Sequence, residues 1–120
     1  MLILYYKINK TKKAEMNFEI STLIEPKYYK SYMYLGDIAL FDNKDNEKAF
    51  LNYTKAIILN SNNADAYYSR SFVYYYMHDF ENALKDIEKA ISLDSKNQFY
   101  IDRKKEILEN KAYYYSDVLN

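Results

Sequence analysis

One stretch of this chain occurs twice at a fixed distance. Residues 49–63 and 83–97 share seven identities in fifteen positions, at a constant offset of 34 residues. The identical pairs are Ala49/Ala83, Lys55/Lys89, Ala56/Ala90, Ile57/Ile91, Leu59/Leu93, Ser61/Ser95 and Asn63/Asn97. Because a fixed period of this length is typical of stacked helix pairs, the sequence predicts an array of repeated units rather than one globular core. Such arrays present extended surfaces for binding.

The composition agrees with an all-α fold. The chain has 120 residues, enough for one domain, and 49% of them are hydrophobic, enough for a core. A single Gly and a single Pro leave little turn chemistry for a sheet protein. The 17 basic and 17 acidic side chains give a net charge of zero. We therefore expect no broad basic surface, and so neither nucleic acid nor a membrane surface as a partner.

The sequence also limits location and covalent chemistry. It contains no Cys, which excludes disulfides and thiolate metal sites. The apolar run that opens the chain is too short for a signal-peptide core or a membrane span. The expected location is cytoplasmic.

Helix signals are clearest in residues 64–97. Apolar and small residues follow helical spacing over 66–77 and again over 80–93. Asn63 and Asp79 stand where side chains are expected to cap the two helices. Small side chains occupy the positions where two antiparallel helices must approach closely: Ser71, Ala83 and Ala90.

This pattern resembles the tetratricopeptide repeat, a 34-residue helix–turn–helix unit. In residues 64–97 the matching positions hold Tyr67, Ser71, Tyr74, Phe80, Ala83, Ile87, Ala90 and Leu93. In residues 29–63 they hold Tyr32, Leu35, Gly36, Ala39, Ala49, Tyr53, Ala56 and Leu59. The second set spans 35 residues, which places one extra residue in the turn at 42–45.

The resemblance covers nearly the whole chain as a single domain. Residues 1–28 read as a partial repeat, with a first helix limited to 2–8 and a second half carried by Ala14, Phe18, Ser21, Ile24 and Pro26. Residues 98–120 read as a capping helix and tail. Its expected apolar side is Tyr100, Ile107, Leu108 and Ala112, and its expected charged outer face is Asp102, Arg103, Lys104, Lys105, Glu106 and Glu109. The predicted architecture is an α-solenoid of stacked antiparallel helix pairs with a C-terminal capping helix.

The resemblance implies a concave groove lined by the first helix of each repeat. The residues that match groove positions are Tyr6, Lys30, Met33, Asp37, Tyr68, Phe72, Tyr75, Tyr76 and Arg103. Tyr67 and Tyr74 are expected to face the second helix of their repeat and to belong to the core. Tyrosine combines apolar area with a hydroxyl group, which suits a binding surface. We therefore expect a non-enzymatic interaction module that binds a protein or peptide segment.

One family subtype is not predicted. Some members hold a partner's terminal carboxylate through Lys, Asn and Arg side chains. The corresponding positions here are Met33, Asp37, Ser69, Phe99 and Arg103. Only Arg103 matches, and Asp37 would repel a carboxylate.

Two other functions remain open at this stage. The apolar residues 2–6 lack a preceding helix, so the chain is alternatively a self-associating protein, or part of a longer array that docks through this edge. Single-stranded RNA is a weaker alternative, in which Tyr68, Phe72 and Tyr75 would stack on bases. The zero net charge argues against it.

Catalytic and cofactor chemistry have little support. The single histidine, His78, is expected in an exposed turn, without a second His or a Cys beside it. The carboxylates of Glu47, Glu81, Asp86 and Glu88 are expected on solvent faces, paired with nearby lysines. No cofactor or metal site is predicted.

Overall fold

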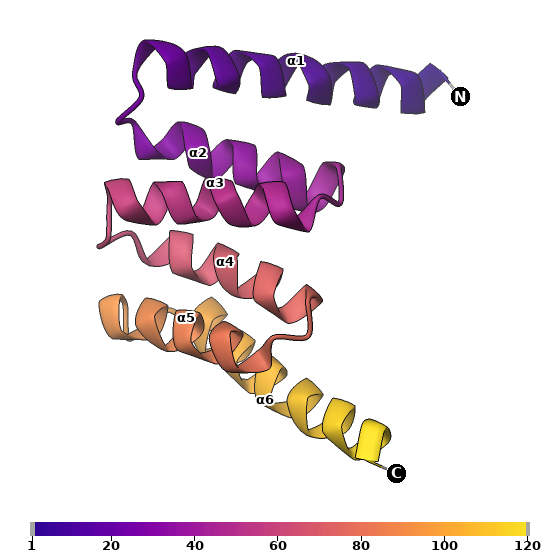
Figure 1. The fold of residues 1–120 in the computed structure, drawn as a ribbon, viewed down its shortest axis with the longest axis vertical. Helices are drawn as coiled ribbons and strands as arrows, with labels where there is room; N and C mark the ends of the chain where they lie inside the picture. The colour runs from indigo at the N-terminus through magenta and orange to yellow at the C-terminus, as the bar shows by residue number, and fades with distance from the viewer. Residues whose placement is uncertain (1, 120) are drawn as a thin grey trace. The chain divides into compact units, whose positions relative to one another are not determined.

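The computed structural model describes residues 2–119, and the side chains of all of these except 5, 6, 118 and 119. Within this range the regular structure is entirely helical (Figure 1). The chain divides into two compact units, unit 1 (Met1–Ser61) and unit 2 (Asn62–Asn120). Their boundary lies next to the repeat boundary expected between residues 63 and 64. No helix of the described part is long and apolar enough to cross a membrane.

Unit 1 consists of α1 (Leu2–Ile24), α2 (Tyr29–Asp37), the π-helical η1 (Ile38–Asp42) and α3 (Asn46–Leu59). Helix α2 lies between α1 and α3 (Figure 1). The α2–α3 contact is close at Gly36, where an added Cβ would come within 2.5 Å of the ring of Tyr53. Because Tyr53 is fully buried, its ring has no space to withdraw. This contact explains the only glycine of the chain.

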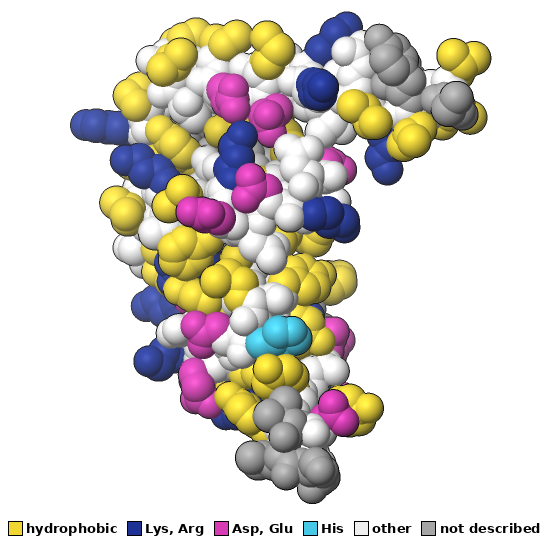
Figure 2. Space-filling model, turned by 45° about the vertical axis from the view of Figure 1, so that its right-hand side comes forward, with side chains coloured by type: hydrophobic (Ala, Val, Ile, Leu, Met, Phe, Trp, Pro, Cys, Tyr) yellow, Lys and Arg dark blue, Asp and Glu magenta, His cyan; other side chains and the backbone are white. Residues whose placement is uncertain are grey.

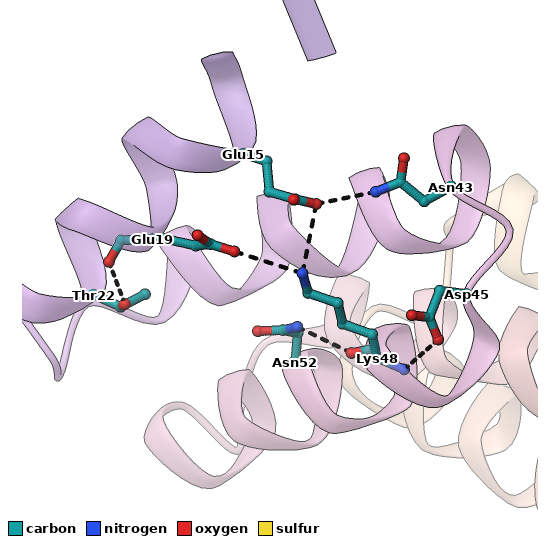
Figure 3. A network of polar contacts seen from close by, with 7 residues as sticks. All are labelled: Glu15, Glu19, Thr22, Asn43, Asp45, Lys48 and Asn52. Atoms are coloured by element: carbon teal, nitrogen blue, oxygen red, sulfur yellow. Dashed lines mark hydrogen bonds and ion pairs between the residues drawn. The ribbon is translucent and has the colours of Figure 1, made fainter. Parts of the chain in front are cut away.

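Helix α1 is continuous, so the expected short first helix at 2–8 is wrong. Residues 9–13 contain neither Gly nor Pro, and nothing in them reverses the chain. Polar contacts tie α1 to the rest of unit 1 (Figure 3): Lys48 of α3 lies 3.6 Å from Glu15 and 3.5 Å from Glu19, and Asn43 donates to Glu15 at 3.0 Å. The rings of Phe18 and Tyr34 stack with centroids 4.7 Å apart.

The extra residue of the 35-residue repeat is taken up by η1, which overlaps the predicted turn at Asp42. The N–H of Asn43 donates to the carbonyl of Ile38 at 3.0 Å, five residues back, which widens the last turn after α2. Lys44 then takes a positive φ of 54°. Asp45 caps α3 by accepting from the N–H of Lys48 at 3.0 Å.

Unit 2 consists of α4 (Ala64–Tyr76), α5 (Phe80–Leu93) and α6 (Gln98–Leu119), with α5 packed against both neighbours. Asp79 caps α5 as expected, accepting from the N–H of Asn82 at 3.2 Å. Asn63 precedes α4, but its side chain makes no capping bond, so that part of the prediction is wrong. The expected small contacts are confirmed, because three side chains are fully buried: Ser71, Ala83 and Ala90.

A buried ion pair joins α4 to α5. The Nε and Nη2 atoms of Arg70 donate to the two carboxylate oxygens of Asp86 at 2.7 Å and 2.8 Å. Burial raises the pKa of the Asp86 carboxyl, and the bonds from Arg70 oppose that rise. The expectation that Asp86 faces solvent is therefore wrong. Position 70, where the repeat pattern usually has Leu, supplies the partner that lets a carboxylate be buried.

Helix α6 turns a different side toward α5 than the sequence predicts. Tyr100 and Ile107 are buried as expected, but Leu108 and Ala112 are exposed. Among the described side chains of α6, the third buried one is that of Arg103, which was expected on the charged outer face. Residues 100, 103 and 107 follow helical spacing, and position 108 lies 100° further round the helix. The hydroxyl of Tyr100 donates to Asp65 of α4, and burial raises the pKa of this phenol.

Candidate functional site

The predicted site residues fall into both units. Lys30, Met33 and Asp37 lie on α2 of unit 1. The others belong to unit 2, with Arg103 on α6 and four aromatic residues on α4: Tyr68, Phe72, Tyr75 and Tyr76. The side chain of Tyr6 lies outside the described residues.

In unit 1 the three predicted residues differ in accessibility. Lys30 is exposed and Met33 is half-buried. Asp37 accepts a hydrogen bond from the hydroxyl of Tyr53 at 2.6 Å, so its carboxylate is tied to the α2–α3 contact. This bond gives Asp37 a structural role within the unit.

In unit 2 the four aromatic residues of α4 form one continuous set of ring contacts, here called the α4 ridge. The rings of Tyr68 and Phe72 meet edge to face at 5.1 Å, and those of Phe72 and Tyr76 lie 6.5 Å apart. Tyr75 meets Tyr76 edge to face at 5.7 Å. The i, i+4 spacing of residues 68, 72 and 76 brings these rings onto one side of the helix. The ridge is half-buried at Tyr68 and 50% exposed at Tyr76.

Arg103 of α6 completes this cluster. Its guanidinium carbon lies 3.8 Å from the centre of the Phe72 ring and 4.4 Å from that of Tyr75. Its Nη1 pairs with Glu106 at 3.1 Å, but its buried Nε and Nη2 have no hydrogen-bond partner among the described residues. Leaving such donors unpaired costs about 1–3 kcal/mol each, and the attraction of the cation to two ring faces offsets part of that cost.

The guanidinium of Arg103 also affects the pKa of Tyr68. Burial raises the pKa of the Tyr68 phenol, while the nearby Arg103 lowers it. The phenol is protonated at neutral pH, so its hydroxyl is able both to donate and to accept a hydrogen bond. The Tyr68 ring also lies 4.9 Å from that of Tyr100, which anchors this end of the ridge on α6.

Beyond the Tyr76 end of the ridge lies a cavity of about 400 Å³, which the sequence analysis did not predict. Its lining residues are Tyr75, Tyr76, His78, Phe80, Asn110, Tyr113, Tyr114 and Asp117. The α6 members have the spacing i, i+3, i+4, i+7 of one helix face. That spacing in the sequence indicates that the four residues share one face of α6. The prediction missed it because it placed the neighbouring Leu108 and Ala112 on the packed side of the helix.

Comparison with known proteins identifies the fold. The family model of the tetratricopeptide repeat matches residues 64–97. The first tetratricopeptide-repeat domain of human RPAP3 superposes with a TM-score of 0.82 at 21% identity, covering 91% of this chain and 85% of that one. The first such domain of Spaghetti (RPAP3), bound to the HSP90 peptide SRMEEVD, gives a TM-score of 0.81 at 21% identity, with 90% and 85% coverage.

A sequence relative has a much longer chain. The UDP-N-acetylglucosamine–peptide N-acetylglucosaminyltransferase of Giardia intestinalis is 39% identical over 77 residues, which are 64% of this chain. This chain spans only 5% of the length of that enzyme.

These findings identify one tetratricopeptide repeat in the chain and the fold of the helices around it. Residues 64–97 are a tetratricopeptide repeat, and the helices around them have the fold of tetratricopeptide-repeat domains. The all-α repeat fold inferred from the 34-residue period, and the resemblance of residues 64–97 to the tetratricopeptide repeat, are thereby confirmed.

Proposed function

We propose that the chain is a non-enzymatic interaction module that binds a segment of another protein. The observation that carries the proposal is the α4 ridge with Arg103 beside it, on a fold shared with a domain that was solved with a bound peptide. Partly exposed tyrosines offer apolar contact area and hydroxyl groups on a rigid helix. Residues of this kind dominate the binding energy of protein interfaces.

Arg103 has a specific place in this proposal. It is only 5% exposed, so its charge acts mainly by holding Phe72 and Tyr75 in position. The rings, rather than the guanidinium, then supply the contact surface. The partner is accordingly a segment with apolar side chains, such as an extended peptide or one face of a helix.

Other activities have weaker support. The similarity to the Giardia transferase involves 5% of that enzyme, so we do not transfer its activity to this chain. The balanced charge of 17 basic and 17 acidic residues argues against nucleic acid as the main partner.

The test is affinity capture from the native lysate, followed by calorimetry with the captured partner. We expect Tyr68→Ala combined with Tyr76→Ala to weaken binding of that partner roughly tenfold or more, as loss of interface hot spots does. Tyr28→Ala together with Ile58→Ala is the control, because both side chains are exposed on unit 1. Unchanged affinity of the Tyr68/Tyr76 variant, with its helical circular dichroism intact, would reject the α4 ridge as the binding surface.

A second candidate function is self-association through α1. The side of α1 that faces away from α2 exposes several large apolar residues, and contiguous patches of this kind mark interaction sites. These residues are Met16, Ile20, Leu23 and Ile24. Helix α6 exposes charged and polar residues opposite its buried side, Asp102, Lys105, Glu109 and Ser116, and large apolar residues elsewhere: Phe99, Ile101, Leu108, Tyr113 and Tyr115.

Sedimentation velocity tests this candidate. We expect a dimer at high protein concentration that becomes a monomer on Met16→Glu plus Leu23→Glu, because two buried charges at the contact would be costly. Lys105→Glu plus Ser116→Glu on α6 should leave the mass unchanged. A wild-type protein that remains monomeric at high concentration would contradict self-association.

A further inference from the structure

The cavity at the end of the α4 ridge has a mostly aromatic lining. Six of its eight lining residues carry aromatic rings, contributed by α4, the turn after it, α5 and α6: Tyr75, Tyr76, His78, Phe80, Tyr113 and Tyr114. Figure 2 shows the single histidine bordered by hydrophobic side chains. We call this site the aromatic cage.

The walls of the cage are held by ring contacts. His78 stacks on Tyr114 with centroids 4.7 Å apart and planes 14° apart. Phe80, which is 3% exposed, contacts both Tyr75 at 5.8 Å and Tyr114 at 5.5 Å. The positive φ of His78, 58°, directs the chain from α4 into α5 at this point. The cage is therefore built on packed helices rather than on a loose loop.

The chemistry of the cage suits a cation. Aromatic ring faces attract positive charge, and a carboxylate, Asp117, stands among the lining residues. No Lys or Arg belongs to the lining, and the adjacent Lys111 pairs with Glu81 instead. A cation that enters thus lies among aromatic side chains and one carboxylate, and none of the lining residues is a Lys or Arg.

The molecule already holds one guanidinium in this way. Arg103 lies 4.4 Å from the centre of the Tyr75 ring, and Tyr75 is also a wall of the cage. Acceptors are available as well: the Asp117 carboxylate, the Asn110 side-chain amide and the tyrosine hydroxyls. A guanidinium, with five N–H donors and a flat face that stacks on rings, uses both kinds of contact. A quaternary ammonium group would use only the rings.

We propose that the aromatic cage binds an arginine side chain of a protein partner. The arginine would stack on the ring walls and direct its N–H groups to Asp117 and Asn110. This inference rests on the proposed function as an interaction module, and it adds one recognised residue of the partner. The aromatic cage shares Tyr75 and Tyr76 with the α4 ridge, and its other lining residues lie outside the ridge.

The first test compares peptides that differ in one side chain. The probes are acetylated, amidated pentapeptides with a central arginine, citrulline, lysine or trimethyl-lysine between alanines, titrated against the full chain by NMR of tyrosine ring signals. We expect saturable shifts of Tyr76 and Tyr113 with the arginine peptide, and binding of the neutral citrulline peptide at least about fivefold weaker. Tyr28 and Tyr34 of unit 1 serve as internal references. Equal binding of arginine and citrulline, or tighter binding of trimethyl-lysine than of arginine, would overturn the proposal.

The second test uses variants of the cage. Tyr113 is 74% exposed, so Tyr113→Ala should leave the fold intact and weaken arginine binding about threefold or more. Asp117→Asn should weaken binding of the arginine peptide without changing that of the citrulline peptide. Phe99→Ala, at a 75% exposed position of the same helix outside the cage, is the matched control. If Asp117→Asn has no effect on binding of the arginine peptide, the carboxylate does not contribute to recognition of the positive charge and the inference fails. The capture experiment on Tyr68 and Tyr76 can still succeed in that case, so failure of the cage is distinguishable from failure of the proposed function.

Discussion

A chain that ends at Lys96, and so lacks α6, is expected to lose the folded structure of unit 2. Helix α6 contributes the buried side chains of Tyr100, Ile107 and Arg103. At about 25 cal/mol per Å² of apolar surface, uncovering their contacts on α4 and α5 costs several kcal/mol. That loss is comparable with the whole stability of a small domain, about 5–15 kcal/mol.

Circular dichroism and hydrogen exchange measure this effect. The truncated chain should lose more helical signal than the 22 residues of α6 account for, because α4 and α5 unfold with it. Amide protection should disappear over residues 64–93, while α2 and α3 of unit 1 provide a reference in the same sample. A truncated protein in which α4 and α5 stay protected and melt cooperatively would show that α6 is an appendage.

A pair of point variants tests whether the loss of stability comes from the buried contacts of α6 rather than from shortening the chain. Ile107 is fully buried, so Ile107→Asp should reproduce most of the loss. Leu108, the next residue, is 45% exposed, and Leu108→Asp should change the free energy of unfolding by only about 0.5 kcal/mol. If the two variants are equally destabilising, the side of α6 that packs on α5 is wrongly assigned.

The sequence predicted the repeat and the helix pairs because the 34-residue period and the positions of small residues are visible in the order of residues along the chain. Ala83 and Ala90 follow the period and are fully buried, and Asp79 caps α5. The prediction that the first helix ends at Ile8 is wrong. The repeat pattern suggested a turn there, but residues 9–13 include neither Gly nor Pro, and α1 continues through them. At residues 9–13 the local composition therefore predicts the structure better than the repeat pattern does.

Charged residues were the main source of error. Arg103 and Asp86 were assigned to solvent because charged side chains are rarely buried without a partner. Their partners lie far away in the sequence: Phe72 for Arg103 and Arg70 for Asp86. Pairing of this kind depends on how two helices meet, which the spacing within either helix does not reveal. The aromatic cage was missed for the same reason, since its walls come from two separate segments of the chain, residues 75–80 and 110–117.

Replacement of Arg70 by Met is expected to destabilise unit 2 by about 3–5 kcal/mol, because it leaves the buried carboxylate of Asp86 without its partner. The Arg70 side chain is 17% exposed and that of Asp86 7%, so water replaces the lost bonds only in part. Urea unfolding followed by circular dichroism measures the change. Lys104→Met is the control, since the Lys104–Glu88 pair is 3.5 Å long and largely exposed; its loss should cost well under about 1 kcal/mol.

The double variant Arg70→Met with Asp86→Leu decides what the ion pair contributes. Replacing both partners by apolar side chains removes the unpaired charge, and such replacements are often neutral or stabilising. We therefore expect the double variant to regain most of the stability that Arg70→Met loses. The free energies of unfolding of the four proteins in this cycle also give the coupling energy between residues 70 and 86 directly. A double variant as unstable as Arg70→Met alone would mean that Arg70 stabilises unit 2 through contacts other than the Asp86 pair, such as that of its guanidinium carbon, which lies 5.6 Å from the centre of the Tyr74 ring.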